Sequence, residues 1–263
     1  MKLPDTIKAA VFDVDDTLLD NQAGATIGTI HEITRLRAIR KTAEKYDLPT
    51  LLEVTEQENM EAFNNAKHHS LEGAVWKTLF DRGVVATDEL DRENEILKEI
   101  ILLKNELHKG TLRELGQPVL DAVEFVAAFA ENYGIENKMA IASTAFRQDL
   151  DIFLDELTPL RSYFPDERIV SFENVSQGNT KPHPEAFNLA FATLGLSEED
   201  RPYVVAFEDD PRGVQSAKAA GLYVCAITTR YSADDPRLLE AKPDYIMENY
   251  ADAIAFLKGE SPA

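Results

Sequence analysis

Short apolar runs that end in polar residues recur along the chain. The first covers residues 8–13, reads KAAVFD, and passes abruptly from apolar residues to acids. Such a run is typical of a parallel strand that is covered on both faces and carries polar groups at its carboxyl end. Further runs of this kind predict strands at residues 138–143, 168–172, 203–207, 223–228 and 244–247.

Helical patterns separate most of these strands. Apolar residues at spacings of three and four predict helices at residues 119–132, 148–157, 184–194 and 212–220. Pro184 suits a first helical turn, and Gly195 and Gly221 suit the position that follows a helix. Alternating strands and helices imply a mostly parallel sheet with helices on both faces. We therefore expect an α/β fold with a three-layer, Rossmann-like core.

Residues 21–115 show a different pattern. Apolar residues recur there at helical spacing, and no strand pattern interrupts them. Gly110 is expected to cap the second of two long helical stretches. We therefore expect an all-helical cap domain at residues 21–115. It is inserted into a discontinuous core domain made of residues 1–20 and 116–263.

Charge and composition limit the partners. The formal net charge of −20 disfavours binding to nucleic acid or to an anionic membrane surface, since both need clustered Lys and Arg. A small anionic substrate stays possible, because one metal ion can reverse the field inside a pocket. The single cysteine, Cys225, lies in an apolar run and is expected to be a small buried hydrophobe. The chain shows no leader-like start and no apolar stretch of membrane-spanning length, so a soluble cytoplasmic protein is expected.

Polar side chains follow four of the predicted strands. In open parallel sheets, ligands bind beyond the carboxyl ends of the strands. Read in order, those ends carry Asp13, Asp15 and Asp16, then Ser143 and Thr144, then Lys181, then Glu208, Asp209 and Asp210. Each segment alone is a weak signal. Together they predict acids, a hydroxyl and one lysine at a single edge of the sheet.

With these segments the sequence resembles the haloacid dehalogenase superfamily. The matching stretches are DVDDT at residues 13–17, Ser143, Lys181 in TKPHPEAF, and Glu208 with Asp209 in AFEDDPRGVQSAKAAGL. The last two are most similar to the phosphatase and phosphomutase branch that includes beta-phosphoglucomutase. The helical insertion falls where that branch carries its small helical C1-type cap. The resemblance covers roughly residues 6–20 and 118–250.

The resemblance implies a catalytic role for the first acids. Asp13 would be the nucleophile that forms an aspartyl-phosphate. Asp15 would protonate the leaving oxygen and later deprotonate water. Asp13, the Asp15 backbone carbonyl and Asp209 would hold Mg²⁺, with Glu208 close by, since oxygen ligands suit this ion. An acid at position 15 also favours C–O–P chemistry over dehalogenation or phosphonate cleavage.

The resemblance also implies how the phosphate is held. Ser143 would hydrogen-bond the phosphoryl oxygens, and Lys181 would neutralise charge on the phosphoryl group and on Asp13. Thr144 stands where Asn is frequent and is a further candidate for substrate binding. Arg147 is a candidate by position, just past Ser143.

Other positions allow two interpretations. Asp16 replaces the usual Gly, a change that some branches share. Asp210, where Ser is common, either tunes the affinity for the metal or caps the following helix, and we favour the cap. His68 and His69 could meet substrate, but a solvated helix face fits them better. Trp76 is expected to anchor the core of the cap domain rather than to stack on substrate.

The predicted function is a Mg²⁺-dependent phosphatase that acts on a small phosphorylated metabolite. A phosphomutase with the same first step is the main alternative. A receiver-type signalling domain also uses acids, a hydroxyl and a lysine, but the long insertion and the order of segments argue against it. A non-catalytic binding protein would not need the full set of reactive residues. The sequence leaves the substrate open, and also the choice between monomer and homodimer.

Overall fold

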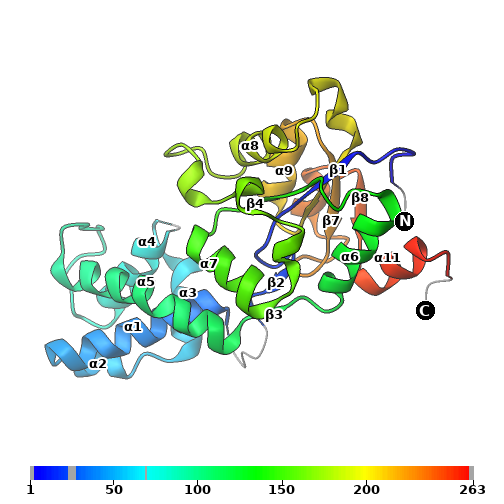
Figure 1. Ribbon diagram of the computed structural model, residues 1–263. Coiled ribbons are helices and arrows are strands. Elements are labelled where there is room, and N and C mark those ends of the chain that lie inside the picture. The colour runs from blue at the N-terminus through cyan, green and yellow to red at the C-terminus, as the bar shows by residue number, and fades with distance from the viewer. Residues whose placement is uncertain (1–2, 23–27, 69, 261–263) are drawn as a thin grey trace. The chain divides into compact units, whose positions relative to one another are not determined.

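The computed structural model describes residues 3–22, 28–68 and 70–260. The chain divides into two compact units. The first combines Met1–Asp20 with Gln117–Ala263, and the second is Asn21–Gly116. We describe each unit by itself, with the element labels of Figure 1.

The first unit is built on a six-stranded sheet in the order β5-β4-β1-β6-β7-β8. Every neighbouring pair is parallel. β1, from Ala9 to Phe12, lies in the middle, where Val11 pairs with Ala140 of β4 and Ala206 of β6. The other strands are β4 Met139–Ala142, β5 Ile169–Val170, β6 Val204–Glu208, β7 Tyr223–Ile227 and β8 Tyr245–Met247. The six predicted strands are thus confirmed, each within a few residues.

Helices cover both faces of this sheet (Figure 1). On one face, α8 Glu185–Thr193, α9 Pro211–Ala219 and α10 Pro236–Glu240 pack against small side chains of the strands. On the other, α6 Ala122–Tyr133 and α11 Tyr250–Leu257 lie together. Aromatic rings fill the core on this second face, where the Phe12 ring stacks on the Phe207 ring with 4.7 Å between their centroids. The expected three-layer α/β fold is confirmed.

Several elements of the first unit differ from the sequence expectation. β2, Leu19–Asp20, pairs antiparallel with β3, Gln117–Pro118, where the chain leaves and re-enters the unit. These strands are too short to leave a periodic pattern. The helix predicted at 148–157 is α7, Arg147–Asp151, followed by a π-helical turn over Ile152–Leu157. The short helices α10 and α11 were not predicted at all.

The second unit is helical. Its elements are α1 Ile30–Tyr46, α2 Pro49–Leu52, α3 Glu56–Asn65, α4 Leu71–Asp81 and α5 Glu95–Leu115. No strand occurs among residues 21–22, 28–68 and 70–116. Thr29 and Thr55 each close a capping box at a helix start. Trp76 is buried in the core of this unit with Leu79 and Ile100, which confirms its predicted role as a core anchor.

Gly110 does not cap a helix, so that expectation was wrong. It lies inside α5, which continues to Leu115, and Gly116 ends the helix with its N–H donating to the Leu112 carbonyl. A single glycine costs only about 1 kcal/mol in a helix, and the packing of α5 against α1 offsets that cost. His68 is exposed in the connection between α3 and α4, and His69 lies outside the described residues.

No helix in the described part of the chain is both long enough and apolar enough to cross a membrane.

Candidate active site

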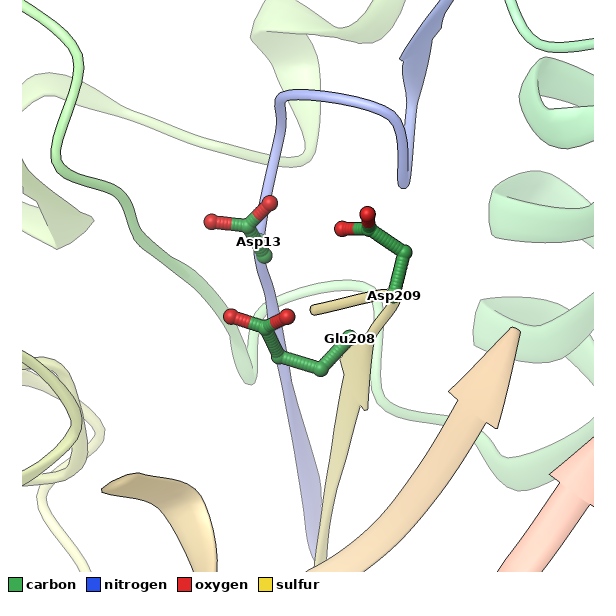
Figure 2. Close-up of side chains that lie close together, drawn as sticks. All are labelled: Asp13, Glu208 and Asp209. Carbon is green, nitrogen blue, oxygen red and sulfur yellow. The ribbon is translucent and has the colours of Figure 1, made fainter. Parts of the chain in front are cut away.

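Three carboxylates converge at the carboxyl ends of the two central strands. Asp13 follows β1 directly, Glu208 is the last residue of β6, and Asp209 comes next (Figure 2). Because Phe12 and Phe207 are partners in the parallel ladder, the residues that follow them emerge side by side. Each carboxylate offers an oxygen within 4.8 Å of the other two, and all three side chains are buried.

Lys181 reaches this cluster from the connection between β5 and α8. Its Nζ lies 2.5 Å from Asp13 Oδ1 and 2.6 Å from Glu208 Oε1, and its side chain is only 9% exposed. The ammonium also lies 5.0 Å from the centre of the Phe187 ring. The structure therefore brings together three of the sequence segments that were expected to meet, those that carry Asp13, Lys181 and Glu208 with Asp209.

The cluster holds more negative than positive charge. Burial raises the pKa of Asp13 well above its ordinary value; Lys181 opposes this effect, and Glu208 and Asp15 add to it. Burial likewise raises the pKa of Asp209, as do the neighbouring Glu208 and Asp13. For Lys181, burial acts to lower the pKa, but the two carboxylates outweigh it and raise the pKa. One ammonium among three buried carboxylates leaves a strong preference for a further cation.

The Glu208 carboxylate is held on both oxygens. Oε1 accepts from Lys181, and Oε2 accepts from the Asp210 N–H at 3.0 Å. The same carboxylate fills the space beside Gly213, where a Cβ would lie 1.7 Å from Oε1. Asp210 itself caps α9, with its side chain accepting from the Arg212 N–H at 2.8 Å. The prediction that Asp210 is a helix cap is confirmed.

Asp209 presents one oxygen without a protein partner. Its Oδ1 accepts from the Thr17 hydroxyl at 3.1 Å. Its Oδ2 is buried and finds no hydrogen-bond partner among the described residues. A buried carboxylate oxygen is rarely left unpaired, because its desolvation costs free energy. This oxygen, the all-carboxylate donor set and the surplus negative charge together fit a hard divalent cation such as Mg²⁺.

The loop after Asp13 turns tightly above the sheet. The Val14 carbonyl accepts N–H groups from Thr17, Leu18 and Leu19. Asp16 has φ +57°, a left-handed conformation that Asp tolerates better than most residues, which explains how it can replace the family's usual Gly. The Asp16 carbonyl accepts from the Thr229 hydroxyl, which ties this loop to the segment after β7.

Ser143 and Thr144 follow β4, the neighbour of β1 in the sheet. Ser143 is fully buried, and its hydroxyl oxygen accepts from the Ala145 N–H at 3.0 Å. Thr144 is exposed. Both residues thus lie at the same edge of the sheet as Asp13, and their roles toward a phosphate stay predictions.

The structure does not place Arg147 in the acidic cluster. Its guanidinium pairs instead with Asp151, at 2.9 Å from Nε, and with Asp166, at 2.6 Å from one terminal nitrogen. Arg161 bridges the same two acids, so the four side chains form one ion-pair network beside α7. A substrate role for Arg147 stays a prediction, and it would compete with these contacts.

Sequence reasoning missed the residues that support the site. Thr17 belongs to the recognised DVDDT stretch, but only coordinates show that its hydroxyl meets Asp209. Gly213 gave a usable signal, since a glycine inside a helix calls for a packing reason. The contact of the Tyr250 hydroxyl with the Thr17 carbonyl, and that of the Thr229 hydroxyl with the Asp16 carbonyl, gave no signal, because each joins segments more than 200 residues apart.

Comparison with known proteins identifies the family. A model of the haloacid dehalogenase-like hydrolase family matches residues 7–221. The chain belongs to this family. The predicted resemblance to the haloacid dehalogenase-like hydrolases is therefore confirmed, and the match takes in the Asp13, Lys181 and Glu208 segments.

Curated relatives among these hydrolases match only part of the chain. Glycerol-1-phosphate phosphohydrolase 1 of Saccharomyces cerevisiae is 33% identical over 119 residues, which is 44% of each chain. Hexitol phosphatase A of Escherichia coli is 42% identical over 74 residues, 28% of this chain and 31% of that protein. The matches thus span less than half the length of these relatives.

Solved structures of the haloacid dehalogenase type resemble the whole chain. A Thermotoga maritima structure assigned provisionally as a beta-phosphoglucomutase covers 96% of this chain and 99% of its own, with a TM-score of 0.67 and 23% identity. CbbY from Rhodobacter sphaeroides, in complex with phosphate, covers 94% of this chain and 96% of its own, with a TM-score of 0.61 and 21% identity. At this level of identity the likeness establishes the fold.

Proposed function

We propose that this protein is a Mg²⁺-dependent phosphatase that uses Asp13 as a covalent nucleophile on a small phosphorylated metabolite. The observation that carries the proposal is the buried contact of Lys181 with Asp13 and Glu208, beside an Asp209 oxygen that has no described protein partner. Lysine and metal charge are what a carboxylate needs to approach an anionic phosphate.

The residues divide the reaction between them. An Asp13 oxygen attacks phosphorus, the ester P–O bond breaks, and Asp15 gives its proton to the leaving oxygen. Asp15 then takes a proton from water, whose oxygen attacks the aspartyl-phosphate and frees inorganic phosphate and Asp13. Throughout, Lys181 neutralises charge on Asp13 and on the phosphoryl group, and Ser143 donates to a phosphoryl oxygen.

The carboxylates of Asp13 and Asp209 and the backbone carbonyl of Asp15 would hold Mg²⁺. The ion would supply positive charge for the phosphoryl oxygens and for Asp13. Glu208 has both oxygens engaged by Lys181 and the Asp210 N–H. Its main contribution in this scheme is therefore to place the lysine, with the cation nearby.

The names of the relatives support the substrate class. A glycerol-1-phosphate phosphohydrolase and a hexitol phosphatase, by those names, act on small phosphorylated polyols. Both align over part of the chain only, so for this protein we propose the broader class of small phosphorylated metabolites.

A metal-dependence assay tests the proposal. We expect purified protein to release phosphate from at least one member of a panel of sugar, polyol and glycolate phosphates in the presence of Mg²⁺. Chelator should lower that rate by at least about 10-fold, because it removes the cation that the carboxylates are proposed to bind. Excess Mg²⁺ should restore the rate. An unchanged rate in chelator would contradict the metal site.

A phosphomutase is the second candidate. The whole-chain likeness to the Thermotoga maritima structure favours it, since that protein is assigned provisionally as a beta-phosphoglucomutase. In a mutase the phosphoryl group passes from Asp13 back to a sugar instead of to water. Incubation with glucose phosphates separates the two functions: isomer formed without free phosphate would replace the phosphatase proposal.

A further inference from the structure

A chain of two hydrogen bonds links the C-terminal helix to Asp209. The Tyr250 hydroxyl, on the first residue of α11, donates to the Thr17 carbonyl at 2.9 Å. The Thr17 hydroxyl donates to Asp209 Oδ1 at 3.1 Å. Thr17 and Asp209 are both buried, and so is Tyr250, which is only 2% exposed. The two bonds therefore lie out of water, where a hydrogen bond is electrostatically stronger than in solvent.

The arrangement decides which Asp209 oxygen is available. Because Thr17 occupies Oδ1, the buried Oδ2 is the oxygen without a described partner. In Figure 2 the Asp209 carboxylate points toward Asp13. Turning the carboxylate out of its present plane would break the Thr17 bond, so Thr17 fixes the orientation of the carboxylate group.

Tyr250 is itself fixed by aromatic packing. Its ring lies 4.9 Å from that of Phe125, which packs edge-on against Phe207 at 5.2 Å. Phe207 stacks on Phe12. Phe12 and Phe207 directly precede Asp13 and Glu208, so the ring that carries the Tyr250 hydroxyl belongs to the same packed layer that supports the carboxylates. Burial raises the pKa of Tyr250 well above its ordinary value, which keeps the hydroxyl protonated as a donor.

We propose that Tyr250 is a positioning residue for the metal site: its hydroxyl holds the Thr17 main chain so that the Thr17 side chain can hold Asp209 with Oδ2 turned to the cation. The inference rests on the proposed Mg²⁺ site. Hydrogen-bonded supports of metal ligands commonly change metal affinity by 10–100-fold when they are removed. The C-terminal helix, which contributes no residue to the recognised motifs, would thus help to set the affinity of the site.

Metal binding without substrate tests the proposal. We expect Tyr250→Phe to weaken Mn²⁺ binding by about 10-fold, as measured from the free-ion electron paramagnetic resonance signal, because the ring stays and only the donor is lost. Tyr133→Phe is the matched control: Tyr133 packs its ring on Phe129 at 4.9 Å, within the same aromatic layer. Equal Mn²⁺ affinity in the Tyr250→Phe and Tyr133→Phe proteins would overturn the inference.

A double-mutant cycle separates the relay from general loosening. Thr17→Val removes the Asp209 bond at nearly constant volume, and Thr17→Ser keeps the hydroxyl. If Tyr250 acts through Thr17, Tyr250→Phe should weaken Mn²⁺ binding in the Thr17→Ser protein but hardly at all in the Thr17→Val protein. Fully additive losses would overturn the relay. A wild-type protein that binds no Mn²⁺ would overturn the proposed metal site as well, whereas intact binding with no effect of Tyr250→Phe would defeat this inference alone.

Discussion

Asp13→Asn is expected to lower the rate of phosphate release by about 10⁴-fold or more, because an amide cannot act as the nucleophile that the reaction requires. Asn has nearly the volume of Asp and can still contact Lys181, so the loss is chemical rather than structural. The measurement is phosphate release with saturating Mg²⁺ and the best substrate of the panel. The wild-type protein should in addition form a phosphoprotein that survives an acid quench and is cleaved by hydroxylamine. The variant should lack this phosphoprotein.

Thermal unfolding provides the control for this variant. Asp13 is one of three buried carboxylates that share one lysine, and burial opposes its ionisation. Removing its charge leaves Lys181 paired with Glu208 and relieves repulsion, so the melting temperature in chelator should stay equal or rise. Phosphate release that persists in a well-folded Asp13→Asn protein would contradict the nucleophile assignment.

Gly213→Ala is expected to lower activity by about 100-fold and to destabilise the fold by about 1–3 kcal/mol. The new Cβ would lie 1.7 Å from Glu208 Oε1 and 2.0 Å from Glu208 Cδ. The Glu208 carboxylate can avoid this Cβ only by leaving Lys181 and the Asp210 N–H. The residue is only 1% exposed, so there is little free space for it to move into. Turnover and the unfolding free energy of the purified variant are the two measurements.

Gly110→Ala is the matched control. Gly110 also lies inside a helix, α5, but a Cβ there would meet no described atom within 4 Å apart from its own stretch of helix. Alanine is the better helix former by about 1 kcal/mol, so this variant should gain stability and keep wild-type activity. If Gly213→Ala also gained stability and kept wild-type activity, the close approach of Glu208 to α9 would not matter for function.

The parts of the fold that sequence reasoning predicts are those with a strong local pattern. Short apolar runs such as AAVF before Asp13 are typical of buried strands, and a run of acids marks where each central strand ends. The two-residue strands β2 and β3 escape prediction because two residues carry no period. Gly110 was misplaced because a glycine near a helix end resembles a cap, whereas the pairing of α5 with α1 carries the helix through it.

The candidate site divides in the same way. The motif residues Asp13, Lys181 and Glu208 could be named from the sequence, and their convergence follows from parallel strands that end at one edge. Their supports could not be named. The bond from Tyr250 to Thr17 spans 233 positions, and the fit of Glu208 beside Gly213 depends on how α9 leaves β6. Such contacts arise from packing in three dimensions and leave no trace in local periodicity.

The small ladder of β2 with β3 has a consequence for how this chain can change over evolutionary time. Leu19 faces Pro118 and Asp20 faces Gln117, so the strand that leaves the first unit and the strand that returns to it are fastened to each other. The free-energy cost of closing a loop between two fixed points grows only slowly with the length of the loop. An intervening module of another size or sequence could therefore be exchanged between these anchors without altering the residues that form the acidic cluster.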